Sequence, residues 1–332
     1  MEKYFSSATG GAVTGQRARG GRETGGCEGA CPIQYPFHGG GCAGTGFGLR
    51  LTSFLIRLTR YNPVMDVSHR WTLPDQASAL AWVTERKSQK IRCTLALLEE
   101  YARTMDEAQK AVEGDIACIQ GIAPTQSGAS LSVKLSAIGS IFDPKASLDH
   151  VLRISREAAR SRVPLELDME GKGSVDLTLD AALACRKEHP NITVALQSYL
   201  HRTGEDIRKM VSQGIGVRLV KGAYLGDYSG LAQIRQATEQ DAGILKALRG
   251  PFSIGTHDPD LIDWTIQEFD DERDLVEFGF LKGLSEMTKI RLAAEGWKVS
   301  EYVPFGPGGD AYVLRRERYL RDLEGSGRAP AP

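Results

Sequence analysis

Short apolar runs recur along the chain from residue 91, and stretches with helical periodicity separate them. The runs are rich in Val, Ile and Leu, which is typical of strands that are buried on both faces of a parallel sheet. We expect eight strands, over residues 91–98, 131–139, 164–170, 192–198, 216–223, 252–257, 275–281 and 298–306. The pattern therefore predicts a sheet of parallel strands.

The stretches between the runs place apolar residues at intervals of three and four, which indicates amphipathic helices. We expect these helices over residues 147–161, 177–186, 205–211, 231–248, 259–268, 284–294 and about 311–323. Strands that alternate with helices in this way favour an α/β fold, a closed (β/α)8 barrel of the TIM type. An open doubly wound sheet is the alternative, but no GxGxxG motif follows an early strand.

The chain outside the barrel has a different character. Residues 1–46 are dense in Gly, Ser, Thr and Ala, and we expect a disordered tail. Residues 47–90 are expected to form an N-terminal helical segment. Within it, the apolar and arginine-containing stretch 47–60 suits either a helix on a membrane surface or one packed on the domain. The catalytic barrel is expected over residues 91–324, and a disordered C-terminus over 325–332.

Composition narrows the class of protein further. The chain has 332 residues, of which 41% are hydrophobic and 25% are charged, which is typical of a soluble globular protein. The net charge of −1 gives no overall basic field that would attract nucleic acid. No stretch approaches 18 consecutive apolar residues, so we expect no transmembrane helix and a cytoplasmic protein. The scattered Cys93, Cys118 and Cys185 are expected to be buried and reduced.

Four residues of the tail have side chains that can bind zinc. Cys27 and Cys31 have the CxxxC spacing of a first ligand pair, and His38 and Cys42 follow. The alternative is a tail that contains these residues without binding metal, and the irregular spacing favours it. We therefore expect no metal site.

Polar residues interrupt the strand-like runs, mostly near their ends. Active sites of TIM barrels lie at the carboxyl ends of the strands, so these residues are candidates for a functional site. They are Lys134, Asp168, Glu170, Gln197, Arg218, Lys221, Tyr224, Thr256, His257, Glu277 and Tyr302, followed by Arg315 and Arg316 in the last helix. For Glu277 we expect a structural ion pair inside the barrel instead.

Cations predominate among these candidates, which indicates that the pocket binds an anion. Arginines favour a carboxylate or a phosphate, because a guanidinium can donate two parallel hydrogen bonds to either group. The barrel shows no cluster of histidines and carboxylates with metal-ligand spacing, and no GxSxG motif. These absences argue against metal-dependent hydrolysis and against a serine nucleophile of that type.

The candidates lie in motifs that resemble those of one known family. The segments LSVKLSAIG, LDMEG, ALQSYLHRT, VRLVKGAYL, GTHD, EFGFL and YVPFG followed by YVLRR resemble, in this order, the motifs of the proline dehydrogenase family. The resemblance extends over about residues 70–323. It implies an FAD-dependent barrel that oxidises L-proline.

The resemblance also implies which residues bind the substrate. Asp168 and Arg218 would form the active-site pair beside the flavin. Lys134, Arg315 and Arg316 would bind the proline carboxylate.

Further positions match the walls of the pocket and the cofactor site of the family. Tyr302 and Tyr312 would line the pocket for the proline ring. FAD would be bound by Met169, Gln197, Arg218, Lys221, Gly222, Ala223, Thr256 and His257.

The implied reaction is the first step of proline catabolism to glutamate. A hydride would pass from the ring carbon next to nitrogen to the flavin N5, and the product would be Δ1-pyrroline-5-carboxylate. In this family the electrons usually pass to a membrane quinone, which favours peripheral contact with the inner face of the membrane. A separate pyrroline-5-carboxylate dehydrogenase would be needed for the second step.

Three positions depart from the family pattern: Tyr319 replaces a usual glutamate, Asp258 a usual asparagine, and Lys282 an aromatic residue or histidine. They leave open whether the substrate is proline or hydroxyproline.

Two other functions also remain open at this point. One is a Schiff-base aldolase with Lys134 or Lys221 as the nucleophile. The other is a barrel that binds an amino acid without catalysis.

Overall fold

The computed structural model describes residues 70–223, 226–325 and 329–332. Several expectations concern other parts of the chain, so they stay predictions. These are the disordered tail 1–46, the segment 47–60, the position of Tyr224 and the four candidate zinc ligands Cys27, Cys31, His38 and Cys42.

Eight parallel strands close into a barrel in chain order, and the last strand pairs with the first. The strands are β1 (Ile91–Leu97), β2 (Ser130–Val133), β3 (Leu165–Leu167), β4 (Ile192–Gln197), β5 (Gly216–Val220), β6 (Phe252–Gly255), β7 (Val276–Leu281) and β8 (Lys298–Phe305). In the closing pair, Ile91 lies opposite Val299 and Leu97 lies opposite Phe305. The predicted (β/α)8 barrel is confirmed.

Some strands end earlier than the apolar pattern predicts, and β2 shows why. The backbone turns directly after this strand, because the Ala137 N–H donates to the Lys134 carbonyl and the Ser140 N–H donates to the Leu135 carbonyl. Leu135 and Ile138 are nevertheless fully buried. Their side chains pack into the core from a turn. In the sequence these two apolar residues therefore look like a continuation of strand β2.

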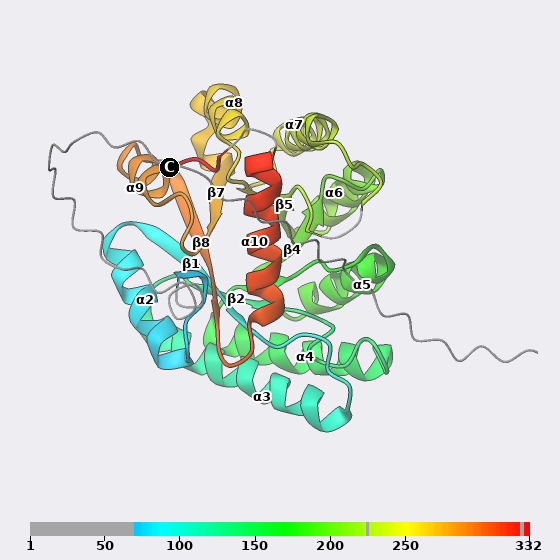
Figure 1. Ribbon diagram of the computed structural model, residues 1–332. Helices are drawn as coiled ribbons and strands as arrows, with labels where there is room; N and C mark the ends of the chain where they lie inside the picture. The colour runs from blue at the N-terminus through cyan, green and yellow to red at the C-terminus, as the bar shows by residue number, and fades with distance from the viewer. Residues whose placement is uncertain (1–69, 224–225, 326–328) are drawn as a thin grey trace, which may run out of the picture. The chain divides into compact units, whose positions relative to one another are not determined.

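Nine helices of the described residues accompany the strands, and Figure 1 shows α2 to α9 around the barrel with α10 crossing it. They are α2 (Gln76–Ser88), α3 (Met105–Ile122), α4 (Pro144–Ser161), α5 (Val175–Arg186), α6 (Thr203–Ser212), α7 (Leu231–Ala247), α8 (Pro259–Phe269), α9 (Glu286–Ala294) and α10 (Asp310–Gly325). Within the described residues, no helix is long and apolar enough to cross a membrane.

The apolar pattern of the sequence did not predict α3, which fills the gap between the first two strands. Its start carries a signal that was available: the Glu107 N–H donates to the Thr104 hydroxyl, and the Arg103 N–H donates to the Glu107 carboxylate. Such reciprocal capping satisfies backbone donors that a helix start leaves free. The buried face of α3 contains several alanines, so its apolar periodicity is weak.

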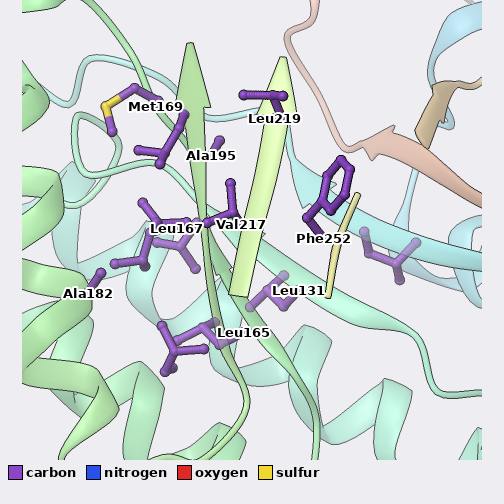
Figure 2. Close-up of a cluster of buried hydrophobic side chains, with 14 of the residues drawn as sticks. Leu131, Leu165, Leu167, Met169, Ala182, Ala195, Val217, Leu219 and Phe252 are labelled. Atoms are coloured by element: carbon purple, nitrogen blue, oxygen red, sulfur yellow. The ribbon is translucent and has the colours of Figure 1, made fainter. Parts of the chain in front are cut away.

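The main core lies between the barrel and the helices. Side chains of a strand point alternately to its two faces, and in β3 and β5 the outward residues Leu165, Leu167, Val217 and Leu219 are almost fully buried. Figure 2 shows these four side chains in one cluster with Ala182 of α5. The intervening residues, which point into the barrel, are the charged ones described below.

The cysteines of the barrel belong to the same core. Cys93, Cys118 and Cys185 are buried free thiols, as the sequence predicted. Burial raises the pKa of Cys185 to about 11 and that of Cys93 to about 12, so both thiols stay protonated at neutral pH.

Candidate active site

Two arginine–carboxylate pairs occupy the inside of the barrel. Arg92 of β1 donates to both carboxylate oxygens of Glu277, at 2.9 and 2.7 Å. Arg218 of β5 donates to Glu166 of β3 at 2.8 Å. Burial alone would raise the pKa of Glu277, but Arg92 outweighs burial and lowers it. The predicted structural role of Glu277 is therefore confirmed.

Asp168 lies at the centre of the charged groups at the carboxyl end of the barrel. Its carboxylate accepts hydrogen bonds from Arg218 at 2.5 Å and from the Tyr302 hydroxyl at 2.7 Å. The ammonium of Lys134 lies 3.6 Å away. Burial would raise the pKa of Asp168, but Arg218 and Lys134 together lower it. Asp168 is therefore ionised at neutral pH.

Lys134 stays charged although its surroundings exclude most water. Burial opposes its charge, but the oxygens of Tyr302, Asp168 and Glu100 outweigh burial and raise the pKa of this lysine. Its Nζ donates to the Tyr302 hydroxyl at 3.2 Å and lies 3.9 Å from Glu100. Burial and the neighbouring carboxylate raise the pKa of Tyr302, so its phenol keeps its proton. Fixed cations and a fixed phenol therefore face the same space.

The two adjacent arginines of α10 have different surroundings. Arg315 donates to Glu100 at 2.6 Å. The guanidinium of Arg316 lies over the Tyr312 ring, 4.8 Å from its centre. The Arg316 Nε and the Tyr312 hydroxyl are buried and have no hydrogen-bond partner among the residues that the structure describes. Arg316 therefore presents an unsatisfied donor beside the cations of the barrel.

Sequence reasoning missed Glu100, although the rule that selected the other residues applies to it. Glu100 follows β1 closely and, like them, lies at the carboxyl end of a strand. The preceding apolar run ends in two consecutive glutamates, which also suit a solvated turn, so the sequence does not mark Glu100 as a pocket residue. Only the structure identifies Arg315 as its partner.

The side-chain amide of Gln197 is held on both sides. Its Nε2 donates to the Glu170 carbonyl at 3.0 Å, and the Tyr199 hydroxyl donates to its Oε1 at 3.0 Å. The Tyr199 ring also lies against Gly222, whose φ is +114° and where a Cβ would lie 1.7 Å from the ring. The position of the Tyr199 ring therefore requires a glycine at residue 222. Glu170 lies in the loop after β3, and its carboxylate accepts hydrogen bonds from Ser136.

His257 is a neutral, buried imidazole. Its Nδ1 bonds to the Ser285 hydroxyl at 2.9 Å, and the Leu281 N–H donates to its Nε2 at 3.2 Å. Burial, assisted by nearby cations, lowers the pKa of His257 well below 6.5. Because the protein engages both ring nitrogens, His257 can support a ligand by its shape and not by a further ring hydrogen bond.

The three departures from the family pattern lie in different places. The Tyr319 ring lies 4.0 Å from the Lys221 ammonium, and both residues line the pocket. Asp258 also lines the pocket and forms an ion pair with Arg235 of α7 at 2.7 Å. Lys282 is not among the residues that line the pocket. Only the first two departures can therefore affect a ligand directly.

One pocket at the carboxyl ends of the strands collects the candidate residues. Glu170 and Glu277 do not line it, and Tyr224 lies outside the described residues. The residues that the resemblance assigned to substrate or cofactor all line it: Lys134, Asp168, Met169, Gln197, Arg218, Lys221, Gly222, Ala223, Thr256, His257, Tyr302, Tyr312, Arg315 and Arg316. Their roles stay predictions. Among the described residues, no group of three His, Cys, Asp or Glu side chains is placed to hold a metal ion.

Comparison with known proteins agrees with this arrangement. The family model for proline dehydrogenase matches residues 79–240. Proline dehydrogenase 1 of Bacillus subtilis (strain 168) is 32% identical over 246 residues, which cover 72% of this chain and 82% of that protein. The chain belongs to the proline dehydrogenase family. As a member of this family it is a proline dehydrogenase-type oxidoreductase. The proline dehydrogenase of Deinococcus radiodurans is 28% identical over 252 residues, covering 72% and 81% of the two chains.

Solved structures with the same fold come from larger proteins. Proline utilization A from Bdellovibrio bacteriovorus, inactivated by N-propargylglycine, matches 76% of this chain with a TM-score of 0.70 and 21% identity. A mutant of proline utilization A from Bradyrhizobium japonicum matches 76% with a TM-score of 0.66 and 23% identity. The chain spans 32% and 30% of these two proteins. At such identities the likeness shows the barrel fold alone.

Proposed function

We propose that this protein oxidises L-proline to Δ1-pyrroline-5-carboxylate with FAD as its cofactor. Membership of the proline dehydrogenase family supports this reaction. The observation that carries the proposal is the buried Arg316 Nε, which has no hydrogen-bond partner among the described residues. A buried donor without a hydrogen-bond partner costs about 1–3 kcal/mol of stability. A substrate carboxylate would satisfy it.

Three cations that line the pocket would bind that carboxylate. Lys134 reaches the pocket from the end of β2, and Arg315 and Arg316 reach it from α10. In the structure Arg315 donates to Glu100, so a bound carboxylate would share this guanidinium with Glu100 or replace it. Charge-assisted hydrogen bonds of this kind are about twice as strong as neutral ones.

The residues around Asp168 would orient the proline ring. The Tyr302 hydroxyl is held between Asp168 and Lys134, which fixes the direction of its ring. Tyr302 and Tyr312 both line the pocket and offer aromatic surface to the ring methylenes. Asp168 and Arg218, the proposed catalytic pair, hold opposite charges at fixed positions, so little rearrangement is needed when charge develops during the reaction.

The pocket also suits the anionic pyrophosphate of FAD. The cations that line it outnumber its carboxylates: Lys134, Arg218, Lys221, Arg315 and Arg316 against Glu100, Asp168 and Asp258. The residues proposed to hold FAD are Met169, Gln197, Arg218, Lys221, Gly222, Ala223, Thr256 and His257. When bound, FAD supplies the acceptor of the hydride from the proline ring. Arg218 would stabilise negative charge that accumulates beside it.

The further context of the reaction is proposed from the family alone. We propose that a membrane quinone reoxidises the cofactor and that a separate pyrroline-5-carboxylate dehydrogenase consumes the product. Peripheral contact of a cytoplasmic protein with the inner membrane face would bring the quinone within reach. The barrel at residues 91–324 would be the catalytic domain.

The pocket argues against Lys134 as a Schiff-base nucleophile and against a barrel that only binds an amino acid. A Schiff-base lysine must lose its proton to attack a carbonyl, but the pKa of Lys134 is raised by the oxygens around it. A barrel that only binds an amino acid would not need the Asp168–Arg218 pair beside the carboxylate site.

The visible spectrum of the purified protein tests the proposal. Flavin absorbance should be present, or should appear after reconstitution with FAD, and it should bleach when L-proline is added without air. Hydroxyproline, added in parallel, decides which ring is the better substrate. A protein that FAD cannot colour, or a flavin that neither compound bleaches, would overturn the proposal. Trapping of a carbonyl substrate by borohydride would then favour the aldolase.

A further inference from the structure

Two contacts hold α10 across the mouth of the barrel. Arg315 bonds to Glu100, which follows β1. One turn further along the helix, the Tyr319 ring meets Lys221, which directly follows β5. In a closed barrel of eight strands in chain order, β1 and β5 lie opposite each other. The contacts therefore fasten α10 at opposite sides of the opening, and Figure 1 shows the helix crossing the barrel.

The contact between Tyr319 and Lys221 is a cation–π interaction. The ammonium lies 4.0 Å from the ring centre, well within the range of about 6 Å for such contacts. Burial is the main reason that the pKa of Tyr319 is raised to about 12, so the phenol is neutral. The face of the ring, and not a charge on the hydroxyl, attracts the lysine.

A neutral ring at this position has a consequence for the pocket. A carboxylate would hold Lys221 equally well, but it would neutralise one of the cations that face the ligands. The neutral ring contacts Lys221 without adding a formal negative charge to the pocket lining.

We propose that Tyr319 is a positioning residue that holds α10 closed over the pocket through Lys221, and that this keeps Arg315 and Arg316 at the substrate carboxylate. The part of this inference that concerns the carboxylate rests on the proposed function. The part that concerns the helix does not. The ring of Tyr319 is required for the contact, and its hydroxyl is not.

Hydrogen–deuterium exchange of the ligand-free protein tests the contact independently of catalysis. Tyr319→Leu removes the ring, whereas Tyr319→Phe keeps it. Lys221→Met removes the cation, and Arg318→Ala alters an exposed residue of the same helix as a control. Exchange of α10 amides should increase about 2- to 30-fold in Tyr319→Leu and in Lys221→Met. It should stay unchanged in Tyr319→Phe and Arg318→Ala.

The double variant decides whether the two residues act on each other. If they form one contact, Tyr319→Leu combined with Lys221→Met should exchange no faster than either single variant. Unchanged exchange in both single variants, or additive effects in the double variant, would overturn the inference. If Tyr319→Leu does not fold, the comparison of Lys221→Met with the parent protein still decides.

Flavin reduction by L-proline then tests the consequence for the substrate. Tyr319→Leu should raise the proline concentration for half-maximal reduction about 2- to 30-fold, with a limiting rate within about twofold of the parent. Tyr319→Phe should match the parent. An unchanged half-maximal concentration would overturn the role in carboxylate binding. If proline fails to reduce the parent protein, the proposed function is wrong, whereas the exchange result still stands.

Discussion

Arg315 of α10 forms an ion pair of 2.6 Å with Glu100, which follows β1. Glu100 also lies 3.9 Å from Lys134, so one carboxylate faces two of the three cations proposed to bind proline. Its negative charge holds these side chains near each other before a substrate arrives. An arginine that is already oriented loses less conformational freedom when it binds a carboxylate.

Replacement of Arg315 should weaken substrate binding and spare the cofactor. In Arg315→Ala the KM for proline should rise by an amount equivalent to about 2–5 kcal/mol, because one partner of a largely desolvated carboxylate pair is lost. The flavin content should stay the same, since Arg315 is not among the residues proposed to hold FAD. Steady-state kinetics and the ratio of flavin to protein absorbance measure the two effects.

Arg318→Ala is the matched control, because Arg318 lies on the same helix but is exposed. Its KM should equal that of the parent protein. An unchanged KM in Arg315→Ala would show that the carboxylate binds elsewhere in the pocket.

The fold and most of the residues that line the pocket could be predicted from the sequence, because polar residues occur near the ends of apolar, strand-like runs. Lys134, Asp168 and Arg218 are such residues, and the barrel brings the Lys134 ammonium within 3.6 Å and the Arg218 guanidinium within 2.5 Å of the Asp168 carboxylate. Ion pairs between residues on opposite parts of the chain could not be predicted from the sequence. Glu100 and Arg315 lie far apart in the chain, and no local sequence pattern predicts that α10 contacts the segment after β1.

The structural roles of aromatic residues that pack against other side chains could not be predicted from the sequence either. Tyr199 donates to Gln197 and its ring packs against Gly222, but in the sequence it is one aromatic residue just after a strand. The same holds for Tyr319, which the family pattern marked only as a departure. Its partner Lys221 becomes visible only when β5 and α10 are placed together.

A buried charge cluster outside the pocket should control stability without affecting turnover. The Glu301 carboxylate bonds to Arg86 at 2.8 Å and to Lys289 at 2.5 Å, and Glu301 and Lys289 have fully buried side chains. Glu301→Gln keeps the shape but leaves the cations with less compensation. The free energy of unfolding in urea should fall by about 3–5 kcal/mol, while the KM for proline stays unchanged.

A surface pair provides the comparison for this cluster. Glu295 pairs with Arg291 at 3.1 Å, and both side chains are nearly half exposed. Glu295→Gln should change the free energy of unfolding by at most about 1 kcal/mol. Equal effects in Glu301→Gln and Glu295→Gln would contradict the assignment of a buried, coupled cluster.

Asp115 of α3 should make stability depend on pH. Burial, with a smaller effect of Glu99, raises the pKa of Asp115 to about 8 from 3.8. Between these values the folded protein binds a proton that the unfolded chain has lost, so this group lowers stability as pH rises from about 4 to 8. Asp115→Asn removes the dependence. The variant should be more stable than the parent at pH 7, by at least about 1 kcal/mol, and the gain should vanish near pH 4.

Urea unfolding of the two proteins at several pH values measures this difference. Asp176→Asn serves as a control, because the Asp176 side chain is 80% exposed and pairs only at the surface with Arg202. Its effect should stay within about 0.5 kcal/mol at every pH. A gain in Asp115→Asn that does not vary with pH would show that Asp115 is ionised in the folded protein.

Gly222 should tolerate no side chain. Its φ of +114° is unfavourable for other residues, and a Cβ would lie 1.7 Å from the Tyr199 ring. In Gly222→Ala the backbone between Lys221 and Ala223 must therefore move, and both neighbours are proposed to hold FAD. We expect a loss of bound flavin after reconstitution and a destabilisation of more than about 1 kcal/mol.

Gly243→Ala is the contrasting substitution, since Gly243 lies in α7 with nothing within 4 Å of the added Cβ. It should stabilise the protein by about 0.5–1 kcal/mol with full flavin content. A Gly222→Ala protein with full flavin content and parental stability would show that Tyr199 does not lie against this turn.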